Sequence, residues 1–97
     1  MAVTVSVEFT TTASNRFLMH KGGHVALDNN GKGKFSVNPN ESDLIFFGIE
    51  GAPGTTAKIT LTVPAPATLD IAGHPIEGRI AQGKIVWGDS RFFRVRQ

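Results

Sequence analysis

The sequence predicts an all-β domain: a small antiparallel β-sandwich of immunoglobulin-like or jelly-roll type, with a compact β-barrel as the alternative. Two segments carry this prediction, residues 3–9 and 57–63, because apolar and polar residues alternate along them. Successive side chains of a strand point to opposite faces, so each segment offers one face to a core and one to water. Several short apolar segments separated by turns rich in Gly, Asn and Pro are typical of sandwiches and barrels.

Further strands are expected wherever a short apolar segment stands between turn residues. These segments are 16–20, 24–28, 33–37, 44–49, 68–72, 76–80, 84–87 and 91–95. The continuous apolar segment 44–49 indicates a central strand covered on both faces. The expected core contains Val5, Val7, Phe9, Leu44, Phe46, Ile59, Leu61, Ile85 and Phe93.

Length and composition set limits on the class of protein. The 97 residues fit a single domain, 1–97, and no stretch has the composition of a linker. The chain has no cysteine, so disulfides and thiolate metal sites are excluded. Together with an N-terminus that lacks a secretory signal pattern, this favours a cytoplasmic location. No apolar run approaches the ~20 residues of a membrane span, and a net charge of +2 is too small to imply nucleic acid or an anionic membrane.

A few identities recur at an offset of 50 residues. Gly23-His24 aligns with Gly73-His74, and Gly33-Lys34 aligns with Gly83-Lys84. Such an offset predicts two similar halves if it reflects a duplication, but β-proteins also share turn residues by chance. We expect chance similarity to be the better explanation.

No combination of residues predicts catalysis, a cofactor or a metal ion. The serines lie outside any nucleophile-elbow context, and the glycine-rich segment 48–56 lacks the Gly-Lys-Ser/Thr of a phosphate-binding loop. His20, His24 and His74 would bind zinc only if the fold gathered them. We expect them to be polar residues near turns, and we expect the protein not to be an enzyme.

Two sets of residues are candidates for ligand binding. The first is the oxygen-rich loop with Asn38, Asn40, Glu41 and Asp43, which together with Trp87 would suit a carbohydrate, with or without calcium. The structural alternatives are an ordinary polar loop and a tryptophan that caps the core.

The second set mixes cations with aromatic residues, as proteins that bind single-stranded nucleic acid do. It comprises Lys32, Lys34, Phe92, Arg94 and Arg96. These residues would form one patch only if their strands were neighbours. The alternative is a charged edge strand that discourages aggregation, and the small net charge disfavours nucleic acid.

The function that fits these observations is a non-catalytic binding or interaction module acting through an exposed sheet face or loops. Seven phenylalanines provide more aromatic surface than one small core is expected to absorb, and exposed apolar surface needs a partner. A protein partner or a second copy of the chain is therefore expected. A lectin-like or calcium-assisted carbohydrate binder and a single-stranded nucleic-acid binder are the alternatives.

Overall fold

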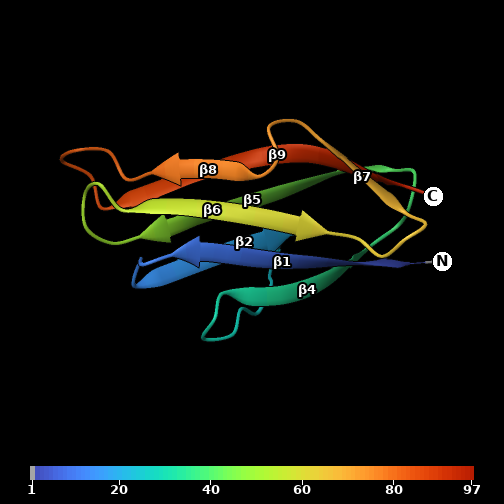
Figure 1. The fold of residues 1–97 in the computed structure, drawn as a ribbon, viewed down its shortest axis with the longest axis horizontal. Coiled ribbons are helices and arrows are strands. Elements are labelled where there is room, and N and C mark those ends of the chain that lie inside the picture. The colour runs from blue at the N-terminus through green and yellow to red at the C-terminus, as the bar shows by residue number, and fades with distance from the viewer. Residues whose placement is uncertain (1) are drawn as a thin grey trace.

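The computed structural model describes residues 2–97, which form strands without helices, in two antiparallel sheets that face each other (Figure 1). The strands are β1 (Val3–Thr11), β2 (Asn15–His20), β3 (Gly23–His24), β4 (Lys32–Val37), β5 (Ser42–Glu50), β6 (Thr56–Thr62), β7 (Thr68–Ile71), β8 (Ile76–Arg79) and β9 (Val86–Arg96). Sheet A has the order β4-β1-β6-β8, and sheet B has the order β3-β2-β5-β9-β7. This arrangement confirms the predicted small antiparallel β-sandwich.

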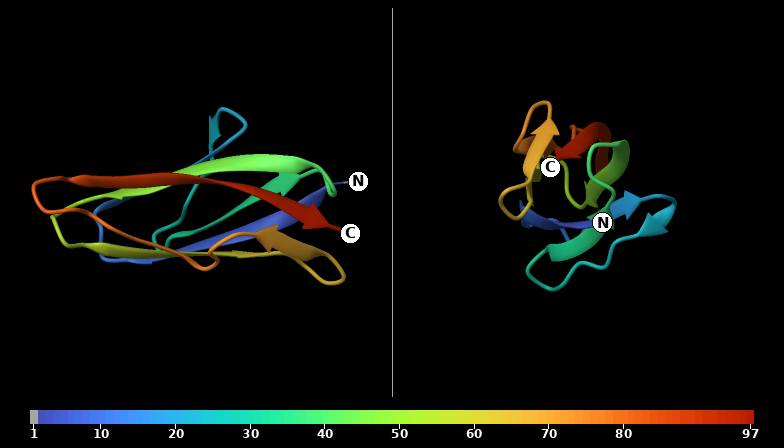
Figure 2. Two further views of the ribbon diagram at one scale, coloured as in Figure 1. Left: turned by 90° about the horizontal axis from the view of Figure 1, so that it is seen from above. Right: turned by 90° about the vertical axis from the view of Figure 1, so that its right-hand side faces the viewer.

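The chain crosses between the sheets at every connection except the one from β2 to β3. The finer assignment, to the immunoglobulin or the jelly-roll type, stays a prediction. The molecule is elongated, with extents of 43 × 25 × 23 Å, and both termini lie at the same end of the long axis (Figure 2).

The strand order has an internal two-fold pattern. In sheet A the pair β4-β1 is followed by β6-β8, and in sheet B β2-β5 is followed by β9-β7. In chain order, the strands β1, β2, β4 and β5 thus correspond to β6, β7, β8 and β9. One match at an offset of 50 follows this pattern, because Gly23-His24 lies between β2 and β4 and Gly73-His74 lies between their counterparts, β7 and β8. The other does not, because Gly33-Lys34 lies in β4 whereas Gly83-Lys84 precedes β9 rather than lying in β8.

The core lies between the sheets and is built by the alternation that the sequence shows. Along β1 the odd residues from Val3 to Phe9 are buried, and Ala57, Ile59 and Leu61 are buried along β6. The two strands pair in a register that sets Phe9 opposite Ile59 and Val7 opposite Leu61. The prediction is confirmed for Val5, Val7, Phe9, Ile59, Leu61 and Phe93, all 3 % exposed or less.

The predicted core is wrong at Leu44, Phe46 and Ile85. In β5 the fully buried residues are Ile45, Phe47 and Ile49, while Phe46 is 50 % exposed and Leu44 is half-buried. β5 is central within sheet B as predicted, between β2 and β9, but only one of its faces is covered. An apolar run without alternation does not reveal whether its odd-numbered or its even-numbered residues face the core. Ile85 lies in the loop before β9 and is 63 % exposed.

Two predicted strand boundaries are also wrong. The predicted strands 84–87 and 91–95 are parts of a single strand, β9, which begins at Val86, because Gly88, Asp89 and Ser90 continue the pairing with β5 instead of forming a turn. Of the predicted strand 24–28, only His24 is in a strand. The rest of that segment closes one side of the sandwich, where Val25 and Leu27 pack against the core.

Replacing Phe47 with alanine is expected to lower the free energy of unfolding by about 3–5 kcal/mol, because it opens a cavity in the core. Phe46→Ala, one position earlier in the same strand, removes a half-exposed ring and should cost about 1 kcal/mol or less. Urea unfolding at low protein concentration compares the two variants. If Phe47→Ala does not fold, Ile45→Val should still cost about 0.5–1.5 kcal/mol. Equal losses at positions 46 and 47 would contradict the observed orientation of β5.

Candidate functional site

The outer face of sheet B carries a continuous group of apolar side chains from three neighbouring strands. We call this group the sheet B face; it comprises Phe17, Met19, Leu44, Phe46 and Phe92. The strand register places Leu44 opposite Phe92 and Met19 opposite Phe46. Phe46 is 50 % exposed and Phe92 is 72 % exposed. Because no further layer packs on this side of the sandwich (Figure 2), the aromatic rings face solvent.

Two paired glycines lie within this face, one covered by a neighbouring ring and the other exposed. Gly48 of β5 pairs with Gly88 of β9, and the ring of Phe17 covers Gly48. A Cβ atom on Gly48 would come within 2.5 Å of the ring of Phe17, so this close packing requires glycine. A shallow hollow of about 350 Å³ lies here, lined by Phe17, Phe46, Phe47, Gly88, Asp89 and Ser90.

The two ends of the sheet B face carry opposite charges. At one end, Arg94 donates a hydrogen bond to the hydroxyl of Ser42 (3.2 Å), and Arg96 pairs with Asp70 (2.9 Å). At the other end, the carboxylate of Glu50 accepts a hydrogen bond from the amide of Asn15 (2.8 Å). The face thus has an apolar centre and a polar rim, the anatomy of a protein interface.

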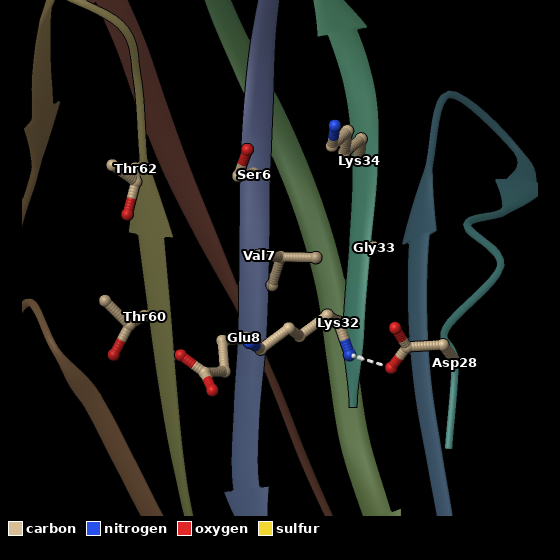
Figure 3. Close-up of a pocket in the computed structure, with 9 residues that line it drawn as sticks. All are labelled: Ser6, Val7, Glu8, Asp28, Lys32, Gly33, Lys34, Thr60 and Thr62. Carbon is tan, nitrogen blue, oxygen red and sulfur yellow. Dashed lines mark hydrogen bonds between the residues drawn. The ribbon is translucent and has the colours of Figure 1, made fainter. Parts of the chain in front are cut away.

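The outer face of sheet A is different, because it carries hydroxyl groups and charges. A depression of about 380 Å³ is lined there by Ser6, Val7, Glu8, Asp28, Lys32, Gly33, Lys34, Thr60 and Thr62 (Figure 3). The cross-strand register aligns Lys34 with Ser6 and Lys32 with Glu8. Hydrogen bonds from the backbone N–H of Lys32 and then of Asn30 hold the pKa of Asp28 below its ordinary value.

The residues predicted for a carbohydrate site do not come together. Asn40 lies at the end where β5 begins, and its side chain forms hydrogen bonds with the backbone of Gln97 (3.1 and 3.4 Å). Trp87 lies at the other end of β5, opposite Ile49. Its indole packs against Phe47, with ring centroids 5.8 Å apart.

The fit of Trp87 depends on Gly78 of β8, where a Cβ atom would come within 2.1 Å of the indole. The structural alternative for Trp87, a cap on the core, therefore matches its surroundings. Asn38 and Glu41 are exposed in the loop between β4 and β5.

The residues predicted for a nucleic-acid patch lie on opposite faces of the molecule. Lys32 and Lys34 belong to β4 in sheet A, and their side chains lie on its outer face. Phe92, Arg94 and Arg96 belong to β9 in sheet B. The condition for one shared patch, that these strands be neighbours, is not met.

The three histidines also lie apart. His20 is almost buried, hydrogen-bonds Asp43 through Nε2 (2.8 Å) and packs against Phe35, with ring centroids 4.7 Å apart. The Nε2 atom of His74 accepts a hydrogen bond from the backbone N–H of Leu61 (2.9 Å), and His24 is exposed in β3. Within residues 2–97, no three His, Cys, Asp or Glu side chains are placed to hold a metal ion.

Comparison with known proteins finds no matching family model, no similar curated protein and no similar solved structure. Nor does the chain from residue 2 to residue 97 include a helix of the length and apolarity that crossing a membrane requires.

Sequence reasoning identified Phe92 as a candidate but missed Phe17, Met19 and the glycine pair. The useful signal was present in β5, where the segment 44–49 places apolar residues at both parities. A strand of that kind buries one parity and offers the other to a second layer. The contributions of β2 and β9 follow only from the register across the sheet.

Two aspartates allow a matched test of whether the His20–Asp43 pair is structural. Each of Asp43 and Asp89 accepts a hydrogen bond from the next backbone N–H and another from a basic side chain, but Asp43 is 13 % exposed and Asp89 is 44 % exposed. Asp43→Ala leaves a buried imidazole without its partner and is expected to cost about 1–3 kcal/mol of stability. Asp89→Ala should cost less than about 1 kcal/mol. Urea unfolding at pH 7 measures both, and a loss at Asp43 no larger than at Asp89 would contradict the structural role.

Proposed function

We propose that this chain is a non-catalytic interaction module that binds a protein partner through the sheet B face. The observation that supports this most directly is the exposure of Phe92 and Phe46 within a continuous apolar group on an uncovered sheet. Folded proteins rarely leave such a group in water unless a partner covers it. Buried aromatic side chains are also frequent among the residues that contribute most to binding.

The setting of the face suits binding with little rearrangement. β5 is held by β2 on one side and by β9 on the other, so Phe46 projects from the middle of a fully paired sheet. A rigid backbone reduces the entropy lost on association. Complete burial of a phenylalanine side chain contributes about 1.5–3 kcal/mol. Because Phe46 and Phe92 are already partly buried, each would gain the fraction of this free energy that corresponds to its present exposure.

A second candidate function is binding of a carbohydrate, and the depression on sheet A favours it. Hydroxyl groups of Ser6, Thr60 and Thr62 stand beside Glu8 and Lys34 in that depression (Figure 3). A polyhydroxyl ligand needs such a mixture of donors and acceptors. This candidate uses residues other than the predicted loop and Trp87, so Thr60→Val should reduce glycan binding while Trp87 fluorescence stays unchanged. A glycan panel without any hit would remove this candidate.

The proposed function predicts that the folded chain binds an apolar dye such as anilinonaphthalene sulfonate at the sheet B face. The double variant Phe46→Ser, Phe92→Ser should lose most of the dye fluorescence, because it removes the two most exposed rings of that face. Ile85→Ser is the matched control, since Ile85 is 63 % exposed but lies outside the sheet B face, and it should keep the signal.

Circular dichroism should show that all three proteins stay folded at the concentrations used. A folded wild type that does not bind the dye, or a double variant that binds it equally well, would overturn the proposed function.

A further inference from the structure

We propose that the partner of the sheet B face is a second copy of this chain, packed face to face about a two-fold axis that runs across the strands. This inference rests on the proposed function, because it uses the same surface. It names the partner and fixes the relative orientation of the two copies.

The argument starts from the rows of outward-facing residues that the register defines across sheet B. The central row contains Met19, Phe46 and Ser90. One step toward the arginine end, Leu44 lies opposite Phe92, and this row protrudes because Phe92 is 72 % exposed.

One step the other way, the row contains Phe17, Gly48 and Gly88. The ring of Phe17 covers Gly48, and the hollow described above lies at Gly88. A raised row and a row that is low at Gly88 thus flank the central row at equal distances.

A two-fold axis along the central row exchanges the raised row with the low row. Phe92 of one copy then lies over Gly88 of the other copy, and Leu44 lies over the ring of Phe17 that covers Gly48. Each copy gives a protruding ring and receives one, as an isologous interface requires. Phe46 lies on the axis and meets its own counterpart, which places two aromatic rings at the centre of the contact.

The charges favour the same orientation. The axis brings the row of Ser42 and Arg94 against the row of Asn15, Glu50 and Val86 of the other copy. Glu50 then lies over Ser42, and Arg94 lies over Val86, one strand away from Glu50. Neither Arg94 nor Glu50 takes part in an ion pair within residues 2–97, so both charges are available to a partner. An axis along the strands would instead bring the two arginine ends together, where like charges repel.

The outline of the molecule leaves room for a dimer contact. Its extents of 43 Å and 25 Å enclose roughly 1,000 Å², and a stable interface buries about 800 Å² on each partner. Two sheets that face each other pack at about 10 Å with a small angle between their strands. The proposed dimer therefore repeats on the outside of sheet B the packing that the sandwich has on its inside.

Cysteine cross-linking tests this geometry, because the chain has no cysteine of its own. Ser90 lies in the central row, so two copies of Ser90→Cys should be close enough for a short bis-maleimide to join them. Thr68→Cys is the control: Thr68 lies opposite Arg96 beyond the arginine end, and its two copies should be roughly 40 Å apart at about 3.3 Å per residue along the strands. Cross-linked dimer is expected for Ser90→Cys and not for Thr68→Cys.

A charge exchange provides an independent test. Arg94→Glu and Glu50→Arg should each weaken self-association on the order of tenfold, and the double variant should restore it. Equal cross-linking at positions 90 and 68, or no restoration in the double variant, would overturn the proposed orientation. A wild type that binds the dye at the sheet B face but gives no Ser90→Cys dimer would overturn the second copy as partner and leave the proposed function standing.

Discussion

The packing of the inward side of β5 against sheet A is the interaction on which the rest of the structure depends. Ile45, Phe47 and Ile49 are fully buried, and they meet the inward residues of β1 and β6 across the sandwich. β5 is also the central strand of sheet B, so its orientation sets that of β2 and β9 through their registers. Shifting the register of β5 by one residue would turn each of its side chains to the opposite face of sheet B.

The same orientation determines what the protein offers to its surroundings. Because the odd residues of β5 fill the core, Leu44 and Phe46 face outward, and the registers add Phe17, Met19 and Phe92 to them. Sheet A has no such residues on its outer face, since β1 and β6 alternate strictly between apolar and polar side chains. The two faces of the sandwich are therefore chemically different, and only the face of sheet B is suited to an apolar contact.

Polar groups at the edges of the core are used to hold the sandwich together. His20 and Asp43 satisfy each other beside Phe35 and Phe93, and His74 provides an acceptor for the N–H of Leu61. No buried side-chain nitrogen or oxygen within residues 2–97 lacks a hydrogen-bond partner. His20 and His74 therefore have structural partners, and they lie apart instead of forming a set of metal ligands.

The sequence was sufficient to predict the sandwich, because β1 and β6 alternate clearly and their buried residues follow from that alternation. It was not sufficient for β5, where apolar residues stand at both parities and neighbouring strands decide which parity is buried. It also could not show that β9 runs through Gly88-Asp89-Ser90, since this depends on pairing with β5 over its whole length. The contact of the Trp87 indole with Gly78 joins β9 to β8, and no local sequence pattern predicts it.

Sedimentation equilibrium of the wild-type chain tests most directly whether one side of β5 packs in the core while the other side contacts a second copy of the chain. The account predicts that the average mass rises with concentration from that of one chain toward that of two, and that it levels off there because the contact is closed. A mass equal to one chain at every concentration, or one that keeps rising past two chains, would contradict it.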